Sequence, residues 1–207
     1  YSFPCQDLSK AGRMKGMDKE ANTRSGLLWE IERILDEAVS IDKLPQVLVM
    51  ENVPEVIGTR NKKNFMLWFD KLESLGYQSY FKIVDSRHFG IPQHRERCFM
   101  ISILGNYSYS FPKGFKLETR VIDHMQDVVD YHHFLSQKMI DKMTGADKDE
   151  KRKIINYYVP DESEKLNEIC CLNGMIDGKR VSQTNRILDS RGIGVTITCG
   201  YTGYYAV

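Results

Sequence analysis

The 207-residue sequence lacks any long hydrophobic run, and no stretch approaches the roughly 20 consecutive apolar residues that a membrane-spanning helix needs. It also lacks a basic leader followed by an apolar segment, the pattern of a secretory signal peptide. The sequence has almost no excess of one charge sign, because 29 Lys and Arg balance 28 Asp and Glu, for a net charge of +1. These absences argue against a membrane protein and a uniformly basic protein, and they predict a cytoplasmic location.

Paired cysteine motifs are also absent. The chain has five cysteines, an odd number, and none has the C-x-x-C spacing of a zinc site. They are Cys5, Cys98, Cys170, Cys171 and Cys199. Reduced thiols are the simplest interpretation. The adjacent His132 and His133 suit neither one helix face nor a metal site, so we predict no bound metal.

Positive charge is clustered locally even though the average is neutral. The clusters lie at 60–63 (RNKK), 87–97 (RHFGIPQHRER) and 179–191 (KRVSQTNRILDSR). Nucleic-acid binding needs a basic face and not a basic average. A charge run alone is more often a solvated surface, so the clusters only permit this function.

Apolar periodicity predicts alternating helices and strands. Helices are expected at 25–39, with Ser25 as a possible cap, and at 63–77, ended by Gly76. Strands are expected at 1–4, 46–52, 79–86 and 97–104.

This alternation is typical of a layered α/β fold with a mainly parallel sheet. The continuous apolar run of 46–52 predicts a strand buried on both faces. The short connection between the last two strands predicts an antiparallel hairpin. We expect one domain over 1–105 and a second, smaller, irregular and β-rich domain over 106–207.

Polar side chains follow several of the predicted strands. These residues are Cys5, Glu51, Asn52, Gln93, Arg95 and Arg97. In open parallel sheets, ligands bind outside the carboxyl ends of the strands. A thiolate can act as a nucleophile, a carboxyl can donate a proton, and arginines can hold an anion or a carbonyl oxygen. Together they predict a catalytic cleft.

Each of these residues also has a purely structural explanation. Cys5 could be a small buried hydrophobe, and Glu51 could be a helix or loop cap. The two arginines could form surface ion pairs with Glu96 or Asp85. A cysteine hydrolase using His88 or His94 is a further alternative, although neither histidine has an evident Asp or Asn to orient it.

Three segments resemble the signature blocks of the DNA cytosine-5 methyltransferases. They are SFPCQDLSKAG, VMENVPEVI and FGIPQHRER, in this order. TRSGLLWEIERIL (23–35) resembles the helix that the family has between the first two blocks. The resemblance covers 1–105 and resumes near 181–200. It implies part of a Rossmann-like methyltransferase sheet with helices on its faces, followed by a target-recognition domain.

The resemblance assigns catalytic roles to four residues. It implies that Cys5 attacks carbon 6 of a target cytosine and that Glu51 hydrogen-bonds and protonates its ring nitrogen 3. Arg95 and Arg97 would hold the base carbonyl and neighbouring groups. The implied methyl donor is S-adenosylmethionine, with Pro4 and Leu27 as contacts that can still be carried over.

The implied partner is double-stranded DNA containing a flipped-out cytosine. The resemblance adds Gln6, Ser9, Asn52, Gln183, Arg186 and Thr196 as substrate-binding residues. Asn52 would tie its strand end to the Pro4–Cys5 loop, and Gln183 would fill the space left by the flipped base or contact its orphaned partner base. Arg186 would pair with guanine. Generic loop polarity remains the alternative for the last two residues.

Two blocks of the family are not found in this sequence. They are the F-x-G-x-G loop that cradles the methionine part of the cofactor and the Gly-Asn-Ser/Ala-Val block. The chain could therefore be a fragment, one subunit of a split methyltransferase that needs a second chain, or a DNA-binding remnant without catalysis. An RNA-directed member is a further alternative. We expect a restriction-modification role in a bacterial or phage-infected cell.

Overall fold

The computed structural model describes residues 1–8, 16–19, 23–138, 168–171, 175–176, 179–180, 186–195 and 204–206. The chain divides into two compact units, Tyr1–Asp85 with Glu96–Lys113 and Ser86–Arg95 with Gly114–Val207. Each unit is described by itself. The domain division at 105 and 106 stays a prediction.

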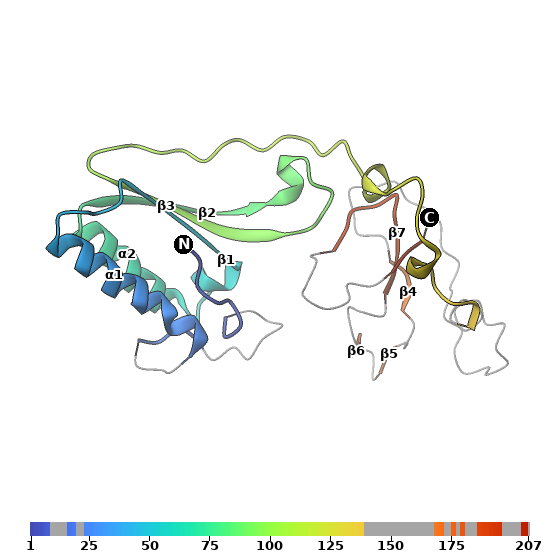
Figure 1. The fold of residues 1–207 in the computed structure, drawn as a ribbon, viewed down its shortest axis with the longest axis horizontal. Helices are drawn as coiled ribbons and strands as arrows, with labels where there is room; N and C mark the ends of the chain where they lie inside the picture. Colours follow the sequence, from blue (N-terminus) through green and yellow to red (C-terminus); the bar gives the residue numbers. More distant parts are fainter. Residues whose placement is uncertain are drawn as a thin grey trace. The chain divides into compact units, whose positions relative to one another are not determined.

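The first unit contains a three-stranded sheet and two α-helices (Figure 1). Its elements are η1 (Arg24–Leu27), α1 (Leu28–Ser40), β1 (Val47–Asn52), η2 (Pro54–Ile57), α2 (Lys62–Ser74), β2 (Tyr77–Asp85) and β3 (Glu96–Leu104). The predicted helices and the last three predicted strands are therefore confirmed, with small shifts of their ends.

The strand order is β1-β3-β2, and both ladders are antiparallel. The predicted hairpin is confirmed, since β2 and β3 pair from Tyr77 with Leu104 to Asp85 with Glu96. The prediction of a mainly parallel sheet is wrong for these ladders. β1 and β2 do run in the same direction, but β3 lies between them and opposes both.

Residues 1–3 lie extended beside β1, although they are not assigned as a strand. The Tyr1 amino group donates to the Val49 carbonyl oxygen at 2.6 Å, and the Glu51 N–H donates to the Tyr1 carbonyl oxygen at 3.3 Å. Tyr1 is thus bonded to Val49 and Glu51, the two residues on either side of Met50, and this pattern is typical of parallel strands. The predicted strand at 1–4 is therefore not confirmed as a strand, although Tyr1 is hydrogen-bonded to β1 in this pattern.

The first helical segment begins one turn before α1, as a 3-10 helix. Its cap is Thr23, whose Oγ1 accepts a hydrogen bond from Gly26 N at 3.1 Å. The prediction of Ser25 as the cap is wrong, because the Ser25 hydroxyl instead donates to the Pro4 carbonyl oxygen at 2.6 Å. A Thr before a helical turn is an equally good cap.

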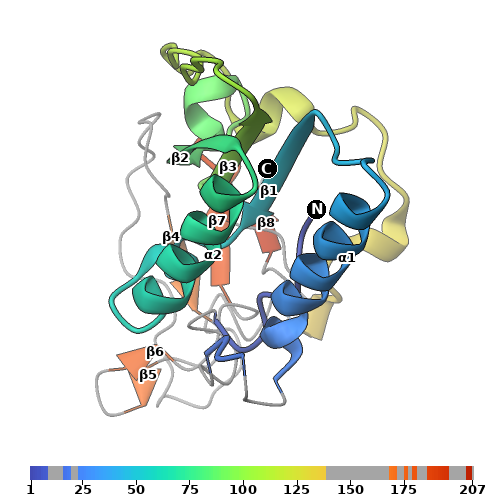
Figure 2. The same ribbon diagram turned by 90° about the vertical axis from the view of Figure 1, so that its left-hand side faces the viewer.

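Figures 1 and 2 show α1 and α2 on the same side of the sheet. The core lies between them and includes Leu28 and Leu35 of α1, Trp68 of α2 and the strand residues Met50 and Met100, none more than 2% exposed. Helices were expected on both faces. Among the described residues, the two α-helices cover only one.

The opposite face of the sheet is partly open. Val47 and Val49 are 49% and 46% exposed, whereas their neighbour Met50 is fully buried. The prediction that this strand is buried on both faces is therefore wrong for the described chain. The segment after β3 covers part of this face: the Tyr80 hydroxyl donates to the Tyr107 carbonyl oxygen at 3.0 Å, and the Tyr80 and Tyr109 rings lie 6.1 Å apart.

The described part of the second unit contains short strands. They are β4 (Glu168–Cys171), β5 (Met175–Ile176), β6 (Lys179–Arg180), β7 (Arg186–Asp189) and β8 (Tyr204–Ala206). β4, β7 and β8 form one sheet in the order β4-β7-β8, and β5 pairs with β6. No helix within the described ranges has the length and apolar character to cross a membrane. The identity of this unit as a target-recognition domain stays a prediction.

Cys98 on β3 gives the first testable prediction. Burial raises the pKa of its thiol from 9.0 to about 11. The folded state therefore keeps the thiol neutral at a pH where the unfolded chain ionises it, so stability falls as the pH rises from 9.0 to about 11. We expect the urea midpoint to drop between about pH 8 and about pH 10.5, and to drop less in Cys98→Ala. An equal drop in both proteins would assign the effect to other groups.

Candidate active site

Cys5 lies in a tight turn after the extended segment beside β1. The Leu8 N–H donates to the Cys5 carbonyl oxygen at 3.0 Å, which closes the turn formed by residues 4–8, here called the Cys5 turn. The thiol is free and partly exposed. Phe3 and Leu8, which are 3% and 2% exposed, anchor the chain on either side of it. The thiol is therefore held by its neighbours while remaining accessible.

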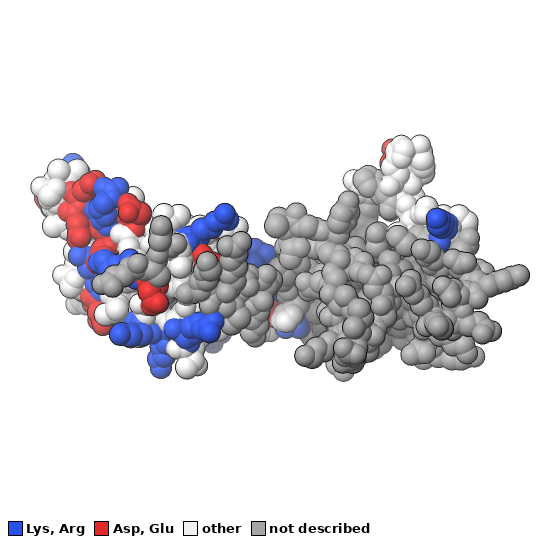
Figure 3. Space-filling model, turned by 90° about the horizontal axis from the view of Figure 1, so that it is seen from below, with Lys and Arg blue, Asp and Glu red and all other residues white. Residues whose placement is uncertain are grey.

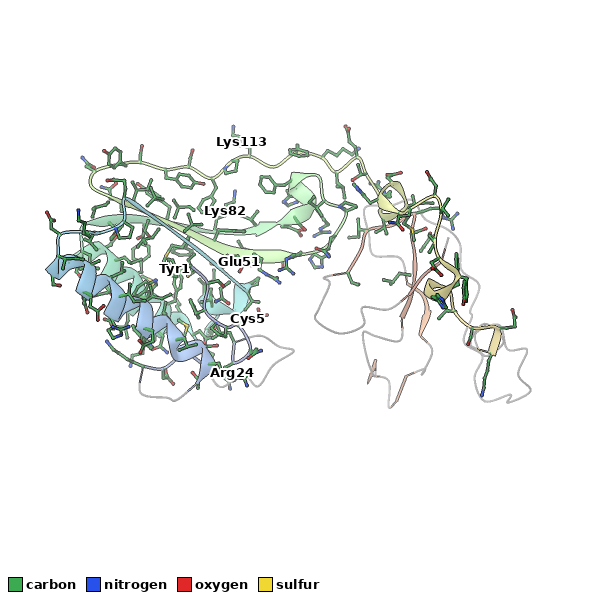
Figure 4. All side chains as sticks on the ribbon, viewed as in Figure 1. Tyr1, Cys5, Arg24, Glu51, Lys82 and Lys113 are labelled. Atoms are coloured by element: carbon green, nitrogen blue, oxygen red, sulfur yellow. The ribbon has the colours of Figure 1, made fainter. Side chains whose placement is uncertain are left out.

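Glu51 and Arg97 form an ion pair on the sheet. Arg97 Nε donates to Glu51 Oε1 at 3.0 Å, and the side chains are 18% and 37% exposed. Glu51 pairs with Phe99 across the β1–β3 ladder, and Arg97 lies two residues away on the same face. The Ser2 hydroxyl also donates to the Glu51 carbonyl oxygen at 2.9 Å. Figure 4 shows Glu51 and Cys5 toward the same end of β1.

The partner of Arg97 differs from those considered from the sequence. Its ion pair is with Glu51, and its contact with Glu96 runs from Nη1 to the main-chain oxygen at 2.7 Å. An arginine held by a carboxylate on a neighbouring strand has a fixed direction. It retains further N–H groups that could bind a carbonyl oxygen.

Asn52 ties the end of β1 to the segment that carries the thiol. This residue is 2% exposed, its Nδ2 donates to the Phe3 carbonyl oxygen at 3.0 Å, and its Oδ1 accepts from Val53 N at 2.8 Å. Both ends of the amide are therefore bound to the main chain. A direct contact of Asn52 with substrate stays a prediction.

The other predicted residues of the Cys5 turn bind the start of the first helix. Arg24 Nη1 donates to Gln6 Oε1 at 2.6 Å, and the Pro4 carbonyl oxygen accepts from Ser25. Leu27 lies one turn further along η1 and is 49% exposed. The role of Pro4 and Leu27 as cofactor contacts stays a prediction.

Arg95 and Gln93 belong to the second unit, so their placement beside Cys5 or Glu51 stays a prediction. The Arg95 carbonyl oxygen accepts from Ser86 N at 3.1 Å. Gln93 fixes its own loop, since its Nε2 donates to the Val195 carbonyl oxygen at 3.1 Å. Hydrogen bonds between the loop and residues 194–195 therefore hold it within this unit.

Four predicted substrate contacts are beyond what can be described. Ser9, Gln183 and Thr196 lie outside the described residues. The backbone of Arg186 begins β7, opposite Cys171 of β4, but its side chain is not among those described. Their roles stay predictions.

Asp7 of the Cys5 turn, and Arg24 and Ser25 which contact this turn, were not identified from the sequence as parts of the site. Asp7 is 6% exposed, and its Oδ2 accepts from Arg24 N at 2.9 Å. The signal that could have found them is local: an acidic residue two positions after the cysteine and a Thr-Arg-Ser stretch that opens a helix. The contact between Asp7 and Arg24 joins residues 17 positions apart, and the spacing of apolar residues does not predict such a contact.

The surface around the helices carries mixed charge. Figure 3 shows Lys and Arg interspersed with Asp and Glu over the helices of the first unit. Arg33 pairs with Glu30 and Glu37 along α1, and Lys71 of α2 pairs with Asp36 of α1 at 2.6 Å. This helical side therefore lacks the uniform basic character of a nucleic-acid-binding face.

Comparison with known proteins finds methyltransferases with similar sequences. The chain is 42% identical over 141 residues to the type II methyltransferase M2.ScrFI of Lactococcus lactis subsp. cremoris, covering 68% of this chain and 38% of the relative. It is 50% identical over 116 residues to the orphan methyltransferase M.SssI of Spiroplasma monobiae, covering 56% of this chain and 30% of the relative. The chain thus spans well under half the length of these relatives.

One solved structure shares the fold at low sequence identity. The Entamoeba histolytica methyltransferase EhMeth matches with a TM-score of 0.54 and 19% identity, over 69% of this chain and 43% of that one. The family described as C-5 cytosine-specific DNA methylase matches residues 1–192, nearly the entire sequence. The chain with the Cys5 turn and the Glu51–Arg97 pair therefore belongs to the C-5 cytosine-specific DNA methylase family.

Proposed function

We propose that this chain provides the nucleophile and the base-holding groups for methyl transfer to carbon 5 of a cytosine in double-stranded DNA. The observation that carries the proposal is the Glu51–Arg97 ion pair on the strand whose end Asn52 ties to the Cys5 turn. Family membership supplies the reaction class. Because the chain covers only part of its relatives, the activity belongs to the protein that contains it.

The thiolate of Cys5 adds to carbon 6 of the cytosine, forming a sulfur–carbon bond. The electron pair of the ring double bond moves toward carbon 5, which becomes nucleophilic. S-adenosylmethionine, when bound, supplies an electrophilic methyl group on a sulfonium. After transfer, water takes the proton from carbon 5, and the electrons of that carbon–hydrogen bond re-form the double bond. The Cys5 sulfur leaves with the electron pair of its bond to carbon 6, and ring nitrogen 3 returns its proton to Glu51. A partly exposed thiol in a fixed turn suits both the attack and the departure.

Glu51 hydrogen-bonds ring nitrogen 3 and delivers a proton to it as the thiolate adds. This proton offsets the negative charge that the addition pushes into the ring. Arg97 contacts the base carbonyl, and its Nε keeps the carboxylate oriented. Arg95 has the same proposed carbonyl-binding role. The Glu51–Arg97 pair must loosen when Glu51 carries its proton, so the two residues act together and not independently.

The substrate base has to leave the helix, because its ring faces are stacked inside a duplex. Extruding a nucleotide costs a few kcal/mol. Gln183 would occupy the vacated space, Arg186 would read a guanine, and Thr196 would lie near the backbone of the flipped base. Gln6, Ser9 and Asn52 complete the proposed contacts around it.

Binding of the cofactor needs more contacts than Pro4 and Leu27 supply. Pro4 and Leu27 suit an apolar part of S-adenosylmethionine, whereas its carboxylate and ammonium groups require polar partners. We propose that a companion segment with an F-x-G-x-G loop, on a second chain or elsewhere in the same protein, supplies them. Exposed apolar side chains support this proposal, since large ones lie on α1, directly before and after it, and on the open face of β1. They include Leu27, Ile34, Ile41, Val47 and Val49.

Replacement of the nucleophile gives the most direct test. In the active methyltransferase that contains this chain, Cys5→Ala should lower methyl transfer by more than about 1,000-fold, because it removes the group proposed to form the bond to carbon 6. Binding of the same DNA, followed by gel shift, should remain. Cys98→Ala removes the buried thiol that lies opposite Asn52 in the β1–β3 ladder and that has no part in the proposed chemistry, so it serves as the control and should keep transfer. Transfer by Cys5→Ala would refute the assignment.

The proton-donating role of Glu51 predicts a separable defect. Glu51→Gln keeps the size and the hydrogen-bonding ability but removes the acid, so kcat should fall by about 100-fold to about 10,000-fold. Arg97→Lys keeps the charge and loses the Nε contact, and a smaller fall is expected. Single-turnover methyl transfer measures both. An unchanged rate for Glu51→Gln would remove this residue from the mechanism.

The incomplete cofactor site predicts weak binding by the chain alone. We expect isothermal titration with S-adenosylmethionine to give a Kd above about 1 mM, since apolar contacts alone leave the charged groups without partners. Mixing the chain with S-adenosylmethionine and cytosine-containing DNA should give no turnover. Micromolar binding or turnover by the isolated chain would overturn the need for a companion segment.

A further inference from the structure

The Cys5 turn is fastened to the first two residues of η1 by three hydrogen bonds. Ser25 Oγ donates to the Pro4 carbonyl oxygen at 2.6 Å, and Arg24 N donates to Asp7 Oδ2 at 2.9 Å. Arg24 Nη1 donates to Gln6 Oε1 at 2.6 Å. The residues on both sides of the thiol are therefore attached to the same short stretch of helix.

The Asp7 and Ser25 side chains are buried, at 6% and 0% exposure. Asp7 acts a second time through its main chain, since its carbonyl oxygen accepts from Gly16 N at 2.9 Å. The Gly16 carbonyl oxygen in turn accepts from Thr23 Oγ1 at 3.2 Å, just before the helix. Asp7 thus joins the Cys5 turn, the chain at Gly16 and the helix start at one point.

The physical chemistry favours a carboxylate at this position. η1 continues directly into α1, so Arg24 is the first residue of a helical segment that ends at Ser40. The unpaired N–H groups and the dipole at a helix N-terminus favour a negative charge. A charge-assisted hydrogen bond to Arg24 N is stronger than a neutral one, and its loss would remove the carboxylate partner of this N–H.

Other contacts already attach these segments to the unit. Phe3 and Leu8 are buried on either side of the turn. Trp29 Nε1 donates to the Met17 carbonyl oxygen at 3.0 Å, and Asn64 Nδ2 donates to Asp18 Oδ1 at 2.6 Å. The buried Phe3 and Leu8 side chains therefore also help to hold the turn against the unit. The hydrogen bonds of Asp7 and Ser25 add a fixed direction for Cys5, which lies between Pro4 and Asp7.

We propose that Asp7 and Ser25 are positioning residues that set the place and orientation of the Cys5 thiol. Neither touches the base or the cofactor in this proposal, and both act through the turn. The inference rests on the proposed role of Cys5 as the nucleophile. A displacement of about 1 Å in a reacting group can cost about 100-fold in rate. The hydrogen bonds of Asp7 and Ser25 that hold the turn, here called the clamp, are therefore expected to affect the rate of methyl transfer.

Four variants test the proposal: Asp7→Ala, Asp7→Asn, Ser25→Ala and the control Asp18→Ala. Asp7→Ala removes the acceptor for Arg24 N, whereas Asp7→Asn keeps an oxygen of the same reach. Ser25→Ala removes one hydroxyl with little change in volume. Asp18→Ala removes a carboxylate from the same region that bonds Asn64 and has no contact with the turn.

Two readouts separate positioning from a general loss of structure. The first is the rate at which iodoacetamide alkylates Cys5 in the isolated chain, followed by peptide mass spectrometry. The second is kcat and KM for DNA in the active methyltransferase. Because alkylation does not require methyl transfer, failure of the proposed function and failure of this inference are distinguishable.

We expect Asp7→Ala to change the alkylation rate by at least about 3-fold and to lower kcat by at least about 10-fold, with KM for DNA within about 2-fold of the original. Ser25→Ala should act in the same direction. Asp7→Asn should restore most of both quantities, and Asp18→Ala should leave both unchanged.

The proposal is overturned if Asp7→Ala keeps the original alkylation rate and kcat, or if Asp18→Ala reproduces its effects. If Asp7→Ala does not fold, Ser25→Ala alone decides, and an unchanged alkylation rate in that variant refutes the clamp. If Cys5→Ala still transfers methyl groups while alkylation responds to Asp7, the clamp holds and the proposed function fails.

Discussion

The site depends on one buried amide. Asn52 binds the Phe3 carbonyl oxygen with its nitrogen and the Val53 N–H with its oxygen, so β1 and the segment before Cys5 cannot shift independently. A buried amide that lost either partner would carry the cost of an unsatisfied polar group, about 1–3 kcal/mol. That constraint keeps the thiol-bearing turn next to the strand of Glu51, and the proposed chemistry relies on this proximity.

The Glu51–Arg97 pair adds electrostatic order to the same strand. Strand pairing puts the two residues on one face, and the 3.0 Å contact between Nε and Oε1 orients both side chains before any ligand arrives. The proposed proton donor and the proposed carbonyl-binding arginine are thus coupled. Preorganisation of this kind avoids reorganisation during the reaction, which is a large part of electrostatic catalysis.

The sequence predicted the local elements well and the long-range arrangement less well. α1, α2 and the strands β1, β2 and β3 follow from apolar spacing, which is a property of neighbouring residues. The place of β3 between β1 and β2, and the half-exposed Val49, depend on which strands pair, and spacing does not encode that. The sequence also placed Glu51 and Arg97 among the candidate site residues. It missed that they pair with each other, and it missed Asp7, because these contacts join segments far apart in the chain.

The mixed charge on α1 and α2 has a practical consequence for work with this protein. The ion pairs of Arg33 with Glu30 and Glu37 are exposed, and such pairs contribute about 0–1 kcal/mol each. Screening them with salt therefore costs the fold little. Affinity for a polyanion, in contrast, falls steeply with ionic strength through counterion release. Salt titrations of this protein would thus report phosphate contacts rather than loss of structure.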